Sequence, residues 1–210
     1  MIAPASISSS TGHGRASRQG LLFVISAPSG AGKTTLCRSV RSDFPDLLYS
    51  VSYTTRKPRS GESEGIDYHF ITAEEFRERI RQDRWAEWAE VHGNLYGTSA
   101  DLLDAGLSAG RDFLLDIDVQ GAIQILARYP DCITIFVMPP DMETLRHRLE
   151  SRGTEGRDEI NRRMINAEKE MARRDRYRHV IVNDRLADAQ DELKALIRHY
   201  RAGGDRRELA

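Results

Sequence analysis

Two glycines, a lysine and a threonine directly after an apolar run have the types and spacing needed to bind a phosphate chain. Residues 26–35 read Ser-Ala-Pro-Ser-Gly-Ala-Gly-Lys-Thr-Thr and follow the run Leu-Leu-Phe-Val-Ile at 21–25. A buried strand, a glycine-containing turn and Gly-Lys-Thr at the start of a helix form the phosphate cradle called a P-loop. Glycine lets the backbone approach phosphate oxygens, and the helix N-terminus supplies unpaired N–H donors with partial positive charge.

Lys33 and Thr34 are the side chains of this turn expected to act on phosphates. Lys33 would place a positive charge at the β- and γ-phosphates, and Thr34 would place its hydroxyl on Mg²⁺. The usual motif, G-x-x-x-x-G-K-[ST], begins with glycine, whereas this chain has Ala27. The preceding strand, the following helix and the intact Gly-Lys-Thr outweigh that departure. The alternative is an ordinary strand-to-helix turn that contains Gly-Lys-Thr.

A second apolar run ends in acids. The run Phe-Leu-Leu-Asp-Ile-Asp at 113–118 predicts a buried strand, and ligands of parallel α/β sheets bind at the carboxyl ends of strands. Asp116 would therefore lie close enough to the P-loop to organise hydrated Mg²⁺. For Asp118, the alternative is that it caps the helix expected to begin near Val119.

Basic residues gather in two further places. Arg56 and Arg59 flank Pro58 in a polar loop, so they can clamp one phosphate from two sides. Between Arg146 and Arg178 there are eleven Lys or Arg residues against seven Asp or Glu residues, which predicts a region that handles anions. A solvated helical face is the alternative for any one of these arginines.

The elements that position these residues alternate along the chain. Apolar strands near 21–26, 112–117, 132–138 and 180–182 are separated by helices, which predicts an α/β fold with a mainly parallel sheet covered on both faces. A strand is expected from Tyr49 to Thr54. A charged helix is expected from about Asp158 to Arg176. The glycine-flanked, arginine-rich hinge before that helix suits a mobile lid.

Composition excludes several classes of function. The 210 residues have a net charge of −1, so no global field favours nucleic acid or an anionic membrane. No apolar run approaches the roughly 18 residues of a transmembrane helix. The two cysteines form no C-x-x-C pair and predict small core residues in the reducing cytoplasm. Residues 1–19 lack acids and apolar periodicity, which predicts a disordered extension, with a weak organelle-targeting peptide as the alternative.

The chain resembles the guanylate kinases, which are P-loop nucleoside monophosphate kinases, from about Leu21 to Tyr200. Four blocks carry the resemblance, and their order is far more selective than a P-loop alone: 26–33, 54–62, 93–98 and 115–118. The resemblance implies a P-loop NTPase domain over 20–202, whose core comprises 20–50, 99–145 and 177–202. A small mixed β lobe that binds GMP would span 51–98, a helical lid 146–176, and a frayed tail 203–210.

By this resemblance the chain transfers the γ-phosphoryl group of ATP to GMP, and to dGMP as well, with Mg²⁺, in purine nucleotide recycling and GTP supply. Its partners would be these small molecules, with no nucleic acid, membrane or obligatory protein partner. The expected ATP contacts are Ala27, Pro28, Ser29, Gly30, Ala31, Gly32, Lys33, Thr34, Thr35 and Asn183. The expected GMP contacts are Ser52, Arg56, Arg59, Glu62, Tyr68, Glu87, Tyr96, Thr98 and Asp118. Lys33, Arg148, Arg152 and Arg163 would be catalytic, and Thr34 and Asp116 would serve the metal, Asp116 through water.

The chemistry of guanine supports this implication independently. Guanine presents N1–H and N2–H₂ donors beside its O6 acceptor, so the carboxylate of Glu87 with the hydroxyl of Thr98 complements it. Adenine would leave a buried carboxylate facing a lone pair, and a site built on such hydrogen bonds rejects the wrong base by about 10⁴ or more. Read without the resemblance, Glu87 is an exposed strand acid between two tryptophans.

Two other functions fit parts of the sequence. Guanylate-kinase-like domains of scaffolding proteins bind protein ligands, but they typically lose P-loop function, whereas Gly32, Lys33 and Thr34 are intact here. A related P-loop kinase could instead act on a phosphorylated sugar or another nucleotide. The two-arginine loop followed by Glu87 and Thr98 argues against that alternative.

Overall fold

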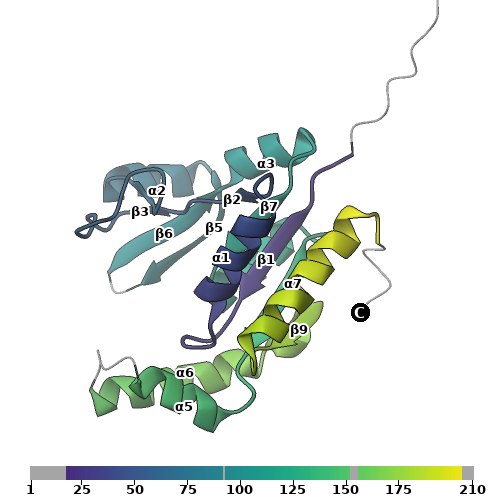
Figure 1. The fold of residues 1–210 in the computed structure, drawn as a ribbon. Coiled ribbons are helices and arrows are strands. Elements are labelled where there is room, and N and C mark those ends of the chain that lie inside the picture. Colours follow the sequence, from purple (N-terminus) through teal and green to yellow (C-terminus); the bar gives the residue numbers. More distant parts are fainter. Residues whose placement is uncertain (1–17, 92, 152–155, 205–210) are drawn as a thin grey trace, which may run out of the picture.

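The computed structural model describes residues 18–91, 93–151 and 156–204, and its centre is a five-stranded parallel sheet (Figure 1). The strands of this sheet A lie in the order β2-β7-β1-β8-β9. Their bounds are Leu22–Ser26 for β1, Leu48–Tyr49 for β2, Phe113–Asp116 for β7, Ile133–Met138 for β8 and His179–Val182 for β9. This confirms the predicted parallel α/β core, to which the structure adds the short strand β2.

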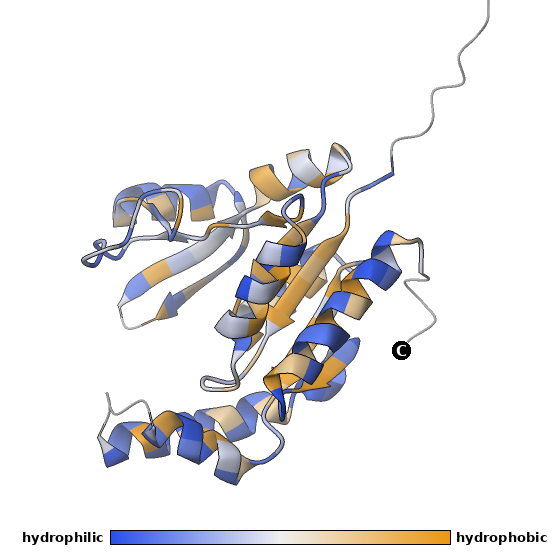
Figure 2. Cartoon of the chain, viewed as in Figure 1, coloured by the Kyte–Doolittle hydropathy of each residue, from blue (hydrophilic) through white to orange (hydrophobic). Residues whose placement is uncertain are grey.

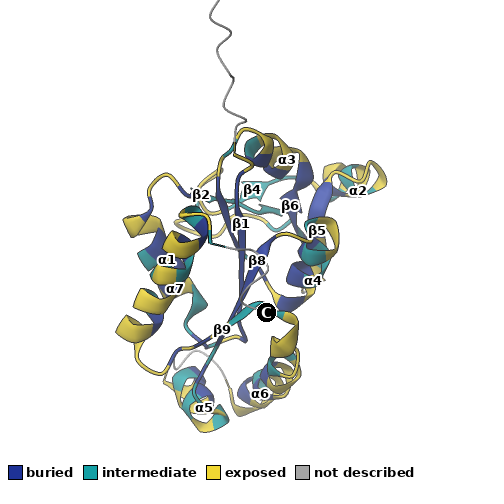
Figure 3. Cartoon of the chain, turned by 90° about the vertical axis from the view of Figure 1, so that its right-hand side faces the viewer, coloured by how far each residue is buried: buried dark blue, intermediate teal, exposed yellow. Residues whose placement is uncertain are grey.

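Helices cover both faces of sheet A, as the continuous apolar strands require. Helices α1 (Lys33–Asp43) and α7 (Leu186–Arg201) lie on one side of the buried strands, and α3 (Ala100–Ser108) and α4 (Val119–Arg128) lie on the other (Figure 3). Successive residues of β1 serve opposite layers: Phe23 packs into the α1–α7 cluster, whereas Val24 packs into the α3–α4 cluster. The strands are accordingly the most hydrophobic part of the ribbon (Figure 2).

A second, smaller sheet carries the lobe that the sequence predicts over 51–98. Sheet B has the order β4-β3-β6-β5, in which β3 spans Tyr53–Thr54, β4 His69–Phe70, β5 Trp85–Val91 and β6 Asn94–Ser99. Helix α2 (Ala73–Arg81) begins at the cap Thr72, whose hydroxyl accepts a hydrogen bond from the Glu75 amide. Phe76, Trp85 and Leu95 form a small separate core between this helix and sheet B.

The strand expected from Tyr49 to Thr54 is two short strands that belong to different sheets. Tyr49 pairs with Leu114 in sheet A, whereas Tyr53 pairs with Gly97 in sheet B. The intervening Ser50 still donates its amide to the Leu114 carbonyl. The alternation of side chains over residues 49–54 is compatible with both short strands. It does not indicate that the pairing partner changes from β7 to β6. The prediction of one continuous strand was therefore wrong.

Helices α5 (Met142–Glu150) and α6 (Arg157–Met171) occupy most of the region expected to be a lid, and they have their own buried cluster, which includes Leu145 and Met164. Asp141 caps α5 by accepting a hydrogen bond from the Thr144 amide. The lid boundary expected at residue 146 falls inside α5. The helix expected to reach Arg176 ends at Met171 and is followed by a short 3₁₀ helix, Arg174–Arg176.

Buried Asp112 joins the two ends of the described chain. Its carboxylate accepts hydrogen bonds from Arg18 Nη2 at 2.7 Å, from the Leu21 amide at 2.8 Å and from Arg201 Nε at 2.9 Å. Residues 1–17 and 205–210, which hold most of the expected disordered extension and of the expected frayed tail, lie outside the described residues. Both cysteines are free and buried, as predicted, and none of the helices described is long and apolar enough to cross a membrane.

Replacing Asp112 should therefore lower stability far more than replacing an exposed acid. We expect Asp112→Ala to reduce the free energy of unfolding by about 3 kcal/mol, because it leaves a buried amide and two guanidinium groups without their shared acceptor. The control Glu78→Ala removes an exposed partner of Arg81 and should cost less than about 0.5 kcal/mol. Urea denaturation measures both, and equal losses would contradict the assignment.

Candidate active site

The P-loop turn depends on two glycines in the left-handed region. Gly30 and Gly32 both have φ +95°, where other residues are strained, and Gly32 is the N-cap of α1. A Cβ on Gly32 would also lie 2.3 Å from Asn183 Nδ2, and one on Gly30 would lie 2.9 Å from a methyl carbon of Leu149 in α5. The turn is thus packed from two sides, and the lid helix touches it directly.

Asn183 braces the P-loop from the end of β9. Its side-chain amide donates to the Ala31 carbonyl at 2.7 Å, and its own backbone amide donates to the Met138 carbonyl. With 5% of its surface exposed, Asn183 is buried against the turn. The resemblance implied that Asn183 contacts ATP, and in the structure its side-chain amide binds the backbone of the P-loop.

Lys33 and Asp116 meet where β1 and β7 end side by side. Lys33 Nζ lies 2.5 Å from Asp116 Oδ1 and donates to the Ile117 carbonyl at 2.8 Å. Tyr49 from β2 donates its hydroxyl to Asp116 Oδ2 at 3.4 Å. Residues of α1 and β2 therefore contact the one acid, at the end of β7, that the sequence assigned to the metal.

The residues expected to serve Mg²⁺ are oxygen donors near the start of α1. Thr34 is exposed in the first turn of that helix, and Asp116 lies beside its neighbour Lys33. No three His, Cys, Asp or Glu side chains of the described residues gather as a metal cage. A hydroxyl and a carboxylate nevertheless fit Mg²⁺, which usually retains waters and phosphate oxygens in its shell.

Two of the three lid arginines predicted from the sequence lie around the P-loop. Arg163 in α6 donates to Ser29 Oγ at 3.2 Å. Arg148 in α5 donates Nη2 to the Asn183 carbonyl at 2.9 Å, whereas its buried Nη1 has no hydrogen-bond partner among the described residues. Arg152 lies outside the described residues.

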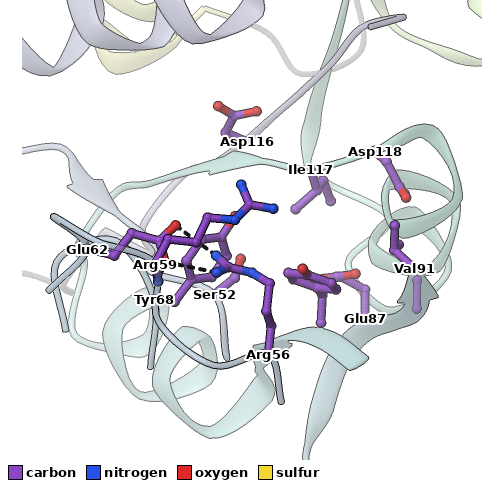
Figure 4. A pocket seen from close by; sticks show the side chains of 12 residues that line it. Ser52, Arg56, Arg59, Glu62, Tyr68, Glu87, Val91, Asp116, Ile117 and Asp118 are labelled. Atoms are coloured by element: carbon purple, nitrogen blue, oxygen red, sulfur yellow. Dashed lines mark hydrogen bonds and ion pairs between the residues drawn. The ribbon is translucent and has the colours of Figure 1, made fainter. Parts of the chain in front are cut away.

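A polar cavity of about 410 Å³ lies between sheet B and the ends of β7 and α4 (Figure 4). It is lined by Ser52, Arg56, Arg59, Glu62, Tyr68, Glu87, Ala89, Val91, Tyr96, Asp116, Ile117 and Asp118. Eight of the nine residues expected to contact GMP are in this set, and the ninth, Thr98, donates a hydrogen bond to Glu87. Asp116 belongs to both the cavity and the Lys33 pair, so the two halves of the site adjoin.

One end of the cavity is built for an anion. Arg56 binds Glu62 through two hydrogen bonds, Nη1 to Oε2 at 3.0 Å and Nη2 to Oε1 at 2.8 Å, which Figure 4 shows as dashed lines. The guanidinium lies 5.4 Å from the ring centre of Tyr68. The Arg59 backbone amide also donates a hydrogen bond to Glu62, so Glu62 connects the two arginines of this loop. The hydrogen bonds from Arg56 are the main reason that the pKa of Glu62 is lowered. The Arg59 guanidinium is exposed, and its charge also helps to lower the pKa of Glu62.

The other end presents a buried carboxylate because β5 contains a bulge. Trp85 pairs with Ser99, but Glu87, two residues later, pairs with Thr98, which directly precedes Ser99 in β6. Two residues that pair across strands point to the same face of the sheet, whereas consecutive residues of one strand point to opposite faces. Ser99 and Thr98 therefore point to opposite faces, and so do their partners. Trp85 enters the core beneath α2, while Glu87 faces the cavity. Thr98 Oγ1 donates to Glu87 Oε1 at 2.6 Å. Glu87 is 7% exposed, so the view of it as an exposed strand acid was wrong.

Burial is also the main reason that the pKa of Glu87 is raised to about 7. The nearby charge of Asp118 raises this pKa further, whereas the hydrogen bond from Thr98 lowers it. Asp118 lines the cavity and also caps α4, since its Oδ1 accepts a hydrogen bond from the Gly121 amide at 2.7 Å. Its proposed cavity role and the capping alternative are therefore compatible.

Several supporting residues were missed by the sequence analysis. Tyr49 orients Asp116, and Gln124 binds both backbone groups of Trp88, accepting from its amide at 3.1 Å and donating to its carbonyl at 2.9 Å. These contacts join residues 67 and 36 positions apart. No local pattern reports such long-range contacts, whereas the local cap of α4 by Asp118 was among the alternatives that the sequence offered.

A parallel sheet with a P-loop after its central strand, beside a polar cavity that holds paired arginines, defines a P-loop kinase of a phosphorylated small molecule. A family model described as guanylate kinase matches residues 19–200. The chain belongs to the guanylate kinase family.

Individual relatives agree with this assignment over nearly the same span. The chain is 49% identical over 180 residues to the guanylate kinase of Geobacter metallireducens, covering 86% of this chain and 89% of the relative. It is 50% identical over 179 residues to that of Dechloromonas aromatica, covering 85% and 89%. The crystal structure of guanylate kinase from Anaplasma phagocytophilum is similar to it with a TM-score of 0.67 and 33% identity over 87% of each chain.

The raised pKa of Glu87 predicts a pH-dependent cost to stability. Below pH 4.5, the ordinary pKa, the group is protonated in both folded and unfolded chains and contributes nothing. As the pH rises toward 7 only the unfolded chain ionises it freely, so the folded state loses stability. We expect the stability of Glu87→Gln relative to the natural chain to increase by on the order of 2 kcal/mol between pH 4.5 and pH 8. Urea denaturation at each pH measures this, and a constant difference would exclude the raised pKa.

Proposed function

We propose that this chain transfers the terminal phosphoryl group of ATP to GMP, giving ADP and GDP, through the residues described above. The observation that carries the proposal is the cavity itself, which has an arginine pair at one end, a buried carboxylate at the other and the Lys33–Asp116 pair at its edge. One bound purine monophosphate would place its phosphate near the P-loop and its base against Glu87. The cytoplasm is the proposed compartment, because both cysteines are free thiols, as expected in a reducing environment.

The base end of the cavity favours guanine over the other bases. The Glu87 carboxylate can accept hydrogen bonds from N1–H and N2–H₂ of guanine. Its Oε1 also accepts a hydrogen bond from the Thr98 hydroxyl, which leaves the remaining lone pairs of the carboxylate for the base. These donors would also offset the cost of burying the ionised carboxylate. A phosphorylated sugar would leave this end of the cavity without donors of matching geometry, and adenine would place a lone pair against it.

Arg56 and Arg59 are proposed to hold the acceptor phosphate. Arg56 is fixed in direction by its two-point contact with Glu62, whereas the side chain of Arg59 is available to close on the anion. Binding between two guanidinium groups would neutralise the acceptor and aim one of its oxygens at the donor. That oxygen attacks the γ-phosphorus while the bond to the β-phosphate oxygen breaks, so ADP leaves and no general base is required.

The donor is proposed to lie on the P-loop, with its phosphates at the N-terminus of α1. Lys33 would move from Asp116 to the β- and γ-phosphates, and Arg148 and Arg163 would neutralise charge from the lid side. Arg152 remains a proposed member of this set. Thr34 and, through water, Asp116 would hold Mg²⁺, which would supply further positive charge to the phosphates.

A panel of acceptors tests the proposed substrate. With ATP and Mg²⁺ present, we expect kcat/KM for GMP to exceed those for AMP, CMP and UMP by about 10⁴ or more, and dGMP to be accepted as well. A coupled assay that detects ADP measures every acceptor in the same way. The absence of any preference for GMP would refute the proposed reading of the base.

Lys33→Ala tests the donor side. We expect kcat to fall by at least about 10²–10³, because the variant removes a positive charge from the transferring phosphates. Circular dichroism should remain unchanged, since the ammonium group is on the surface of the site rather than in the core. Glu78→Ala, far from the cavity, is the control. Turnover like that of the natural chain in Lys33→Ala would falsify the P-loop assignment.

A further inference from the structure

We propose that Gly121 in α4 is a positioning residue for recognition of the acceptor base, because its lack of a side chain leaves room for the Glu87 carboxylate. This inference rests on the proposed function of the cavity and assigns part of its specificity to a residue outside the cavity wall. A Cβ on Gly121 would lie 2.7 Å from Glu87 Oε2 and 3.3 Å from its Cδ. Separations below 3.0 Å require one of the two groups to move.

Close approach, rather than backbone conformation, accounts for glycine at this position. Gly121 lies in the first turn of α4 and is not among the glycines with positive φ. Alanine is the more favourable residue inside a helix, so the backbone alone would favour a side chain here. The carboxylate of Glu87 occupies the space that this side chain would need.

Glu87 has little freedom to step aside through its backbone. It pairs with Thr98 in the β5–β6 ladder, and the next residue, Trp88, is held at both its amide and its carbonyl by the side chain of Gln124. Gln124 lies one turn after Gly121 on the same helix, so α4 fixes the strand at the point where it contacts the carboxylate. A methyl group at position 121 would therefore turn the carboxylate itself.

Turning the carboxylate would alter base recognition and spare the fold. Rotation of the Glu87 side chain breaks its 2.6 Å hydrogen bond from Thr98 and moves both oxygens away from where N1–H and N2–H₂ of guanine would meet them. The displaced group is the flexible end of a side chain, so the surrounding core need not move. The atoms nearest to this methyl group would belong to Glu87 and Asp118, on the base side of the cavity rather than in the P-loop.

The test compares Gly121→Ala with the natural chain in steady-state assays with GMP, AMP and ATP. We expect KM for GMP to rise at least about tenfold, KM for ATP to change less than about twofold, and the kcat/KM ratio of GMP to AMP to fall at least about tenfold. Calorimetric titration with GMP alone, which needs no turnover, should show the same weakening. An unchanged KM for GMP would overturn the proposal.

Gly106→Ala is the matched control for packing strain. Gly106 is also a helix-interior glycine, and a Cβ there would lie 2.3 Å from the Phe113 ring in the core, away from the cavity. We expect it to lower the melting temperature and to leave KM for GMP within about twofold. A comparable rise of KM in Gly106→Ala would show that general strain causes the effect, and this would overturn the role of Gly121.

A double-variant cycle shows whether Gly121 acts through Glu87. In a Glu87→Ala background the obstructing carboxylate is absent, so adding Gly121→Ala should change kcat/KM for GMP less than about twofold and should fold as Glu87→Ala does. An equal effect in both backgrounds would overturn the proposal, as would a Gly121→Ala protein that misfolds and is not rescued by Glu87→Ala. If the natural chain itself showed no preference for GMP, the proposed function would fail instead, and the two failures are thus distinguishable.

Discussion

The parallel pairing of β1 with β7 is the constraint on which the rest of the site depends. In this register Ile25 lies opposite Asp116, so the P-loop begins beside the end of β7. Lys33, which follows the P-loop turn, therefore reaches Asp116. The lobe enters the fold after β2, on the β7 side, and the lid follows β8 on the other side of β1 (Figure 1). The strand order therefore places the phosphate cradle between the two inserted parts.

The site is organised around charges that a ligand would complete. Glu87 is buried with a pKa raised to about 7 by burial, and Arg148 carries a buried nitrogen without a partner among the described residues. Both features cost folding free energy in the protein alone, since buried charges and donors lose their hydration. Guanine donors at one end and donor phosphates at the other would offset those costs. Buried polar groups that lack partners and have shifted pKa values are expected at a site that binds a substrate through those groups.

The sequence predicted those parts of the fold that local pattern controls. The continuous run before residue 26 predicted β1, and the glycines and Lys33 predicted the strand-turn-helix of the phosphate cradle. The resemblance supplied the roles of the cavity residues, which stay proposals. Periodicity alone would have left Glu87 on an exposed strand, because the bulge that turns it inward depends on its pairing with β6.

Long-range pairings determined what could not be predicted. The change of sheet between Tyr49 and Tyr53, the brace from Asn183 to Ala31 and the clearance at Gly121 arise where distant segments meet. The most direct test of the whole account is a crystal structure with ADP, Mg²⁺ and GMP bound together. It should show Lys33 on the phosphates of ADP, the GMP phosphate between Arg56 and Arg59, and the guanine edge against Glu87. A GMP molecule outside the cavity, or one whose base points away from Glu87, would contradict the account.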